Sequence, residues 1–167
     1  SLTHLGMDVV TAGATFIARV VDTNLPMMRE VFQASAEHVG MSFIEAYTNC
    51  VIFNDGAFAD EESRLQRKDS TLELKHGEPL IFGRNSDKGI ILDGYTPKAV
   101  TIGENGVTKE DILVHDEQYD NLAYAFMLAS MRGNGLPTPV GIIRRVKAAT
   151  YEKQVKDQEK QAKERKG

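Results

Sequence analysis

The sequence predicts an α/β protein with a parallel strand–helix–strand unit, a β-rich extension and a charged helical tail. Three observations support this class. Two runs rich in β-branched and aromatic residues, 15–21 and 42–48, flank an amphipathic stretch. Short strand-like runs separated by Gly, Asn, Asp and Pro follow between residues 71 and 102. From residue 150 onward most positions are polar or charged.

The first unit consists of two predicted strands joined by a helix. Thr23 and Asn24 are candidate helix caps, and Pro26 falls in the first turn, where its missing N–H does no harm. Helical spacing then places five side chains on one face, namely Met28, Val31, Phe32, Ser35 and Val39. Gly40 is the predicted end of this helix. Strand, helix and strand within about 35 residues are typical of a right-handed crossover between parallel neighbours.

The middle of the chain predicts a small antiparallel elaboration on this core. The charged run 60–69 indicates a solvated short helix or loop, and residues 139–143 indicate one more edge strand. The four strand candidates are Thr71–Lys75, Leu80–Phe82, Gly89–Leu92 and Lys98–Ile102.

A second amphipathic helix is predicted over 116–131. Gly133 would end it, and its apolar side would carry Tyr119, Leu122, Phe126 and Ala129. The tail after residue 150 offers Glu–Lys pairs four positions apart but little apolar surface. We expect it to form a fraying helix or a segment that docks on a partner.

Composition narrows the functional classes. A chain of 167 residues with 41% hydrophobic content is enough for one packed domain. The net charge of -4, with acidic and basic residues interspersed, argues against nucleic-acid binding. The nearly apolar run 123–131 is too short to span a membrane, and the opening residues do not show the basic-then-apolar pattern expected of a leader. One cysteine allows no internal disulfide, which suits a reducing, cytoplasmic location. The start at Ser1, without methionine, fits a processed chain or a piece of a longer one.

The candidate chemistry outside the cysteine is sparse. The four histidines are far apart and show no metal-ligand spacing, so a zinc site within this chain is not expected. His115 and Asp116 predict a helix cap and not a catalytic pair. Glycine pairs at 103–106 and 133–135 lack a phosphate-binding spacing and indicate turns.

Cys50 is the one residue of special interest. It follows the second predicted strand, and ligands of open parallel sheets gather at the carboxyl ends of strands. A lone cysteine after a strand is more often a small buried side chain. A catalytic thiolate needs a basic or dipolar activator, which no nearby residue supplies. A cluster ligand needs three further sulfurs, which this chain lacks.

The run 13–58, which contains Asn49-Cys50-Val51-Ile52-Phe53-Asn54-Asp55-Gly56, closely resembles the thiamine-diphosphate-binding β subunit of 2-oxoacid:ferredoxin oxidoreductases. The 2-oxoglutarate type is the most similar. The resemblance continues through 100–103, 113–116 and 139–141. It implies that Cys50 is the fourth ligand of a [4Fe-4S] cluster beside the thiamine cofactor. The other three cysteines, and the elements that hold Mg²⁺ and the diphosphate, belong to the family's preceding, amino-terminal half.

The resemblance also implies an organisation and a reaction. Residues 1–58 would be the carboxy-terminal portion of the thiamine-diphosphate-binding domain, 59–149 a β-subunit extension and 150–167 a charged helical tail. The subunit would oxidise a 2-oxoacid, form acyl-CoA and CO₂, and pass electrons through the cluster to ferredoxin. Its partners would be the amino-terminal half, the α subunit, ferredoxin, coenzyme A and the 2-oxoacid. This chain alone is expected to be inactive.

Two other interpretations stay open at this point. One is a non-catalytic structural or subunit-interaction module in which Cys50 is buried and inert. The other is a related thiamine-dependent decarboxylase without a cluster.

Overall fold

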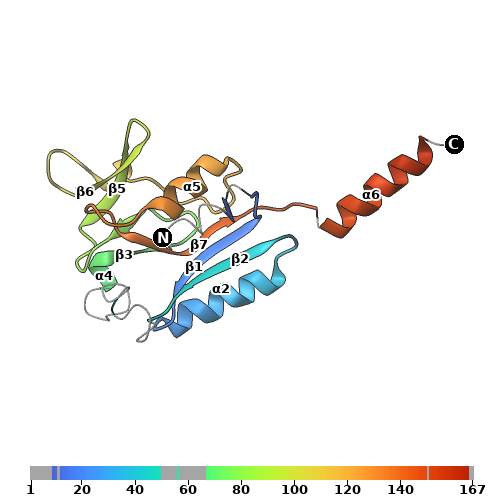
Figure 1. The fold of residues 1–167 in the computed structure, drawn as a ribbon. Coiled ribbons are helices and arrows are strands. Elements are labelled where there is room, and N and C mark those ends of the chain that lie inside the picture. Colours follow the sequence, from blue (N-terminus) through green and yellow to red (C-terminus); the bar gives the residue numbers. More distant parts are fainter. Residues whose placement is uncertain (1–8, 11, 50–55, 57–66, 150, 166–167) are drawn as a thin grey trace.

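The computed structural model describes residues 9–10, 12–49, 56, 67–149 and 151–165. Within them a four-stranded sheet has the order β2-β1-β7-β3, and a three-stranded sheet has the order β4-β5-β6. Figure 1 shows the two sheets with α2 on the side of β1 and β2 and α5 near β7.

The predicted strand–helix–strand unit is confirmed. β1 (Phe16–Val21) and β2 (Ser42–Tyr47) are parallel neighbours, paired from Phe16 with Ser42 to Val21 with Tyr47. The connecting helix α2 (Leu25–Glu37) begins after the N-cap residue Asn24, with proline in its first turn. Its apolar side packs on β1 because Val31 and its neighbours contact Phe16, Ala18 and Val20. The helix ends before Gly40, as the sequence indicates.

The edge strand predicted at 139–143 is wrong in its position. It is β7 (Thr138–Arg145), which lies between β1 and β3 (Thr71–Leu74). β7 runs antiparallel to β1 and parallel to β3. Most of its residues are buried, as expected for a strand covered on both faces. The first strand candidate, 71–75, therefore joins the main sheet and not the antiparallel elaboration.

The antiparallel elaboration itself is confirmed by three strands. They are β4 (Ile81–Phe82), β5 (Lys88–Asp93) and β6 (Thr96–Thr101), each antiparallel to its neighbour. The largest core cluster joins this sheet to the main one through residues such as Leu72, Leu80, Ile90 and Leu128.

The second predicted helix is shorter than expected and faces differently. α5 (Leu122–Ser130) begins after Asn121, whose side chain accepts a hydrogen bond from the backbone N–H of Ala123 at 2.9 Å. Its buried residues are Ala125, Leu128 and Ala129, whereas Phe126 is 41% exposed. Of the predicted apolar side, Ala129 is buried as expected, whereas Tyr119 and Leu122 are exposed like Phe126. Apolar residues occupy nearly every position of α5, so periodicity alone could not select the buried face.

The remaining elements are short or peripheral. α4 (Arg67–Ser70) precedes β3, and a 3₁₀ turn, η1 (Lys109–Asp111), follows β6. α6 (Tyr151–Glu164) forms the predicted tail helix and lies apart from the two sheets (Figure 1). Over the part of the chain that the structure describes, no helix combines the length and apolarity needed to cross a membrane.

Candidate functional site at the carboxyl ends of β1 and β2

The candidate site begins where the two parallel strands end. Asp22 follows β1, and Thr48 and Asn49 follow β2. Because β1 and β2 are parallel, these residues lie together at the end of the main sheet where both strands finish. Cys50 is the next residue, and it lies outside the described residues together with 51–55. The structure therefore defines the scaffold from which the cysteine motif departs.

Hydrogen bonds fix the two strand ends to each other. The Thr48 hydroxyl donates to Asp22 Oδ2 at 2.6 Å, and the backbone N–H of Asp22 donates to the carbonyl of Tyr47 at 3.0 Å. The backbone N–H of Gly56 donates to Asn49 Oδ1 at 3.0 Å. This last bond brings the end of the cysteine motif back to its beginning. The two residues that bracket 50–55 are thus joined directly.

One buried polar atom at this end of the sheet lacks a hydrogen-bond partner among the described residues. Asp22 Oδ1 is buried, and none of the described residues forms a hydrogen bond with it. An unsatisfied buried acceptor costs about 1–3 kcal/mol, so such atoms call for a specific explanation. A hydrogen-bond donor or a cation from outside the described residues would satisfy it.

Tyr47, the last residue of β2, lies beside two guanidinium groups. The Cζ atoms of Arg19 and Arg132 are 5.3 Å and 5.4 Å from the centre of its ring, and Tyr47 is 2% exposed. Both distances lie within the range of cation–π attraction. Arg132 reaches the end of β2 only through the fold, so no local pattern in the sequence could place a basic group there.

Arg19 connects four elements beneath this edge. The residue is 1% exposed, and its Nε donates to Glu45 Oε2 on β2 at 2.8 Å. Its Nη2 donates to the carbonyl of Ala129 in α5 at 2.9 Å, and its Nη1 donates to that of Pro139 in β7 at 3.4 Å. A buried charge with these partners holds β1, β2, α5 and β7 in register around the site.

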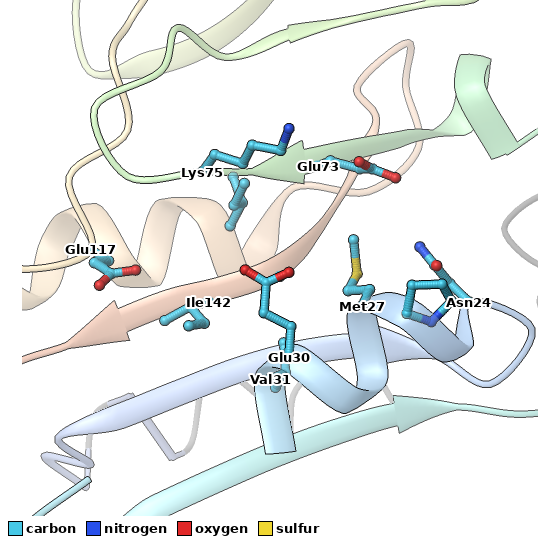
Figure 2. A pocket seen from close by; sticks show the side chains of 11 residues that line it. Asn24, Met27, Glu30, Val31, Glu73, Lys75, Glu117 and Ile142 are labelled. Carbon is cyan, nitrogen blue, oxygen red and sulfur yellow. The ribbon is translucent and has the colours of Figure 1, made fainter. Parts of the chain in front are cut away.

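A cavity of about 400 Å³ lies between α2 and β3, on the side of α2 that faces away from the free edge of β2. Figure 2 shows Glu73 and Lys75 on one side of it and Glu30 and Met27 of α2 on the opposite side, with Glu117 and Ile142 toward one end. Burial raises the pKa of the Glu117 carboxyl, and the nearby Arg145 guanidinium opposes that shift. The carboxylates come from distant parts of the sequence, so no local motif could predict the cavity.

The histidine predicted as a cap is a core residue instead. His115 is 1% exposed, with Nε2 2.8 Å from the carbonyl of Ile142 and Nδ1 3.0 Å from the Tyr124 hydroxyl. Burial lowers the pKa of His115, so the neutral ring donates to the carbonyl and accepts from the hydroxyl. The helix cap is Asn121. Across the described residues, no three His, Cys, Asp or Glu side chains gather in a way that could hold a metal ion.

Comparison with known proteins identifies the chain's relatives. No family model matches the sequence. The 2-oxoglutarate oxidoreductase subunit KorB of Mycobacterium tuberculosis is 33% identical over 148 residues, which are 88% of this chain and 39% of the relative. The chain therefore spans about two fifths of the length of that relative.

The fold is similar to that of a solved enzyme. The structure of 2-oxoglutarate:ferredoxin oxidoreductase from Magnetococcus marinus with 2-oxoglutarate, coenzyme A and succinyl-CoA bound matches with a TM-score of 0.55. The match has 17% sequence identity and covers 95% of this chain and 39% of that chain. This likeness shows the fold, and it confirms the predicted α/β class. Over 88% of its length, the chain is homologous to the 2-oxoglutarate oxidoreductase subunit KorB, as its sequence resemblance indicates.

Proposed function

We propose that this chain is part of the β subunit of a cytoplasmic 2-oxoacid:ferredoxin oxidoreductase that acts on 2-oxoglutarate. The complete enzyme would form succinyl-CoA and CO₂ and reduce ferredoxin. The observation that carries the proposal is the 33% identity over 148 residues to a subunit named for 2-oxoglutarate oxidoreductase. The name of the solved structure with a similar fold adds 2-oxoglutarate, ferredoxin and coenzyme A.

The residues of this chain fit part of a cofactor site. Cys50, the single cysteine, would supply one of the four thiolates of a [4Fe-4S] cluster, and the other ligands would come from the amino-terminal part of the subunit. Asp22 Oδ1, a buried acceptor without a hydrogen-bond partner among the described residues, lies at the same end of the sheet. When bound, thiamine diphosphate with Mg²⁺ would supply the electron sink for decarboxylation, and the cluster would carry single electrons.

The described residues would orient and protect this site. β2 would direct the motif away from the sheet, and the bond between Asn49 and Gly56 would close its base. Tyr47 would restrict water behind the motif because it is nearly fully buried. The guanidinium of Arg132 would favour the thiolate form of the ligand. The described part of the chain would thus position a ligand and tune its charge, without reacting itself.

A chimeric subunit tests the proposal. In it, this chain replaces the matched segment of the mycobacterial subunit, and it is co-expressed with the companion subunit of that enzyme. We expect reduction of ferredoxin that depends on both 2-oxoglutarate and coenzyme A, whereas the isolated chain should have no such activity. An exposed residue far from the site provides the control, because Tyr95→Ser, on the β5–β6 turn, should leave the rate unchanged.

The two other interpretations give different results in the same assay. An assembled chimera that binds cofactors but does not reduce ferredoxin with 2-oxoglutarate would contradict the proposal. Full activity after Cys50→Ser would indicate a decarboxylase without a cluster at this position. A stable complex formed by the isolated chain, together with a chimera that has neither bound cofactor nor activity, would indicate an interaction module.

A further inference from the structure

The helix α5 is apolar all round, but the described residues cover only one side of it. It lies on the opposite face of the main sheet from α2 (Figure 1) and packs inward through Ala125, Leu128 and Ala129. No residue of α5 is charged, and Tyr124 and Ser130 alone carry a hydroxyl. A helix without a polar face is typical of one that is buried on every side. The outer side of α5 is therefore a candidate interface.

Four exposed positions form this outer side. They are Leu122, Ala123, Phe126 and Ser130. At about 100° per residue, these four positions fall within an arc of about 100° around the helix. Leu122 is 37% exposed and Phe126 is 41% exposed, so both large side chains keep much of their apolar surface in water. Contact with another apolar surface would remove that area from water and stabilise the contact.

Large and small residues are placed symmetrically about Phe126. Leu122 lies four positions before it, and Ser130 lies four positions after it. If two α5 helices packed antiparallel across a two-fold axis at Phe126, Leu122 of each copy would meet the small Ser130 of the other. The two Phe126 rings would then lie against each other, and aromatic rings attract in offset or edge-to-face arrangements. The outer side of α5 is thus complementary to itself.

The charges at the two ends of α5 favour the same arrangement. Asp120 precedes the helix, and its side chain is 97% exposed although one carboxylate oxygen is 3.3 Å from the Arg144 guanidinium. Arg132 follows the helix. An antiparallel pair would place Asp120 of each copy near the Arg132 end of the other, whereas a parallel pair would place like charges side by side. Charge complementarity therefore favours an antiparallel second copy.

We propose that the outer side of α5, formed by Leu122, Ala123, Phe126 and Ser130, binds the same surface of a second copy of this chain. The two helices would run antiparallel, and both copies would bury the same residues. Because α5 has only nine residues, the contact is small, and the dimer should be weak and dependent on concentration. The proposal does not rest on the proposed function, since it concerns a surface and not the cofactor site.

Sedimentation velocity of this chain at a series of concentrations tests the association. The weight-average sedimentation coefficient should rise from the monomer value toward the dimer value as the concentration increases. Phe126→Glu should weaken the dimer at least ten-fold, because it replaces a central aromatic contact with two facing carboxylates in an apolar surface. The matched control is Tyr95→Glu, which changes another exposed aromatic residue on the β5–β6 turn and should leave the association unchanged.

Cysteine cross-linking tests the geometry without a charged substitution. In a Cys50→Ser background, Phe126→Cys should give a disulfide-linked dimer on mild oxidation, because the two-fold axis brings the two copies of position 126 together. Ser130→Cys is the matched control. The two copies of position 130 would lie about 12 Å apart along the helices, which is farther than the Cα separation of about 7 Å that a disulfide can span. The same cross-link through position 126 should form in the chimera described above.

Each contrary result overturns the proposal. A chain that stays monomeric at every concentration would mean that no second copy binds α5. A dimer that Phe126→Glu leaves intact would lie on another surface, and equal cross-linking through positions 126 and 130 would exclude the antiparallel arrangement. Cross-linking in the isolated chain but not in the chimera would mean that another part of the enzyme covers α5. Ferredoxin reduction by the chimera tests the proposed function separately, whatever the state of this surface.

Discussion

Replacement of the buried Arg19 should destabilise the chain more than any surface change. Arg19→Met removes the positive partner of Glu45, whose side chain is only 10% exposed, and leaves that carboxylate without its 2.8 Å ion pair. It also removes the donors to the carbonyls of Ala129 and Pro139. Methionine fills similar space, so the main loss is electrostatic.

The expected magnitude follows from the burial of this pair. Removal of one partner of a buried ion pair costs about 3–5 kcal/mol because the other charge stays buried and unpaired. For a domain of this size, each kcal/mol lowers the melting temperature by roughly 2–4 °C, so the variant should melt roughly 6–20 °C lower. Urea unfolding followed by circular dichroism would measure the change in the free energy of unfolding.

A double variant separates the ion pair from the rest of the site. Arg19→Met combined with Glu45→Leu removes both charges, and it should recover about 2 kcal/mol relative to the single variant. The unsatisfied carbonyls would account for the remaining loss. A loss of less than about 1 kcal/mol in the free energy of unfolding of Arg19→Met would refute this reasoning. So would a double variant whose free energy of unfolding falls by the sum of the two single losses.

Three further predictions concern the same scaffold. Burial lowers the pKa of His115, so the folded state favours the neutral ring, and stability should be lost as the pH falls below the unfolded value of about 6.5. His115→Gln should flatten the decline of unfolding free energy between about pH 7.5 and 5.5, and an unchanged slope would exclude this origin. Gly141→Ala should cost about 1–3 kcal/mol by thermal unfolding, since φ is +110° and the new Cβ would lie 3.0 Å from a carbonyl of β3. Gly94→Ala, with open space at its Cβ, should cost less, and equal losses would contradict the steric argument. Thr48→Val should cost about 1 kcal/mol by urea unfolding through loss of the 2.6 Å bond to Asp22, and no change would mean that this bond contributes nothing.

The sequence predicted correctly the elements whose contacts come from nearby positions in the chain. The strand–helix–strand unit is confirmed with its parallel pairing, since caps, helical spacing and β-branched runs all lie within residues 15–48. The strands of the small antiparallel sheet are confirmed for the same reason. Turn residues between short runs fix such hairpins without distant contacts.

The errors arise where distant segments meet. β7 was expected at an edge but lies inside the sheet, because its neighbours β1 and β3 come from far along the chain. Likewise, the spacing of apolar residues in α5 could not reveal which side of the helix the sheets would cover. Arg132 beside Tyr47, and the glutamates around the cavity, are products of the same long-range folding. The role of Cys50 stays a prediction, since the residue lies outside the described part of the chain.

Iron content of the purified chimera, with and without its Cys50 thiol, tests the central claim most directly. With the companion subunit present, the chimera should bind about four iron atoms per cluster site with the visible absorbance of a [4Fe-4S] centre. Cys50→Ser should reduce both iron content and ferredoxin reduction, whereas Tyr95→Ser should retain both. An assembled Cys50→Ser chimera with the full iron content and an unchanged spectrum would show that this sulfur is not a ligand.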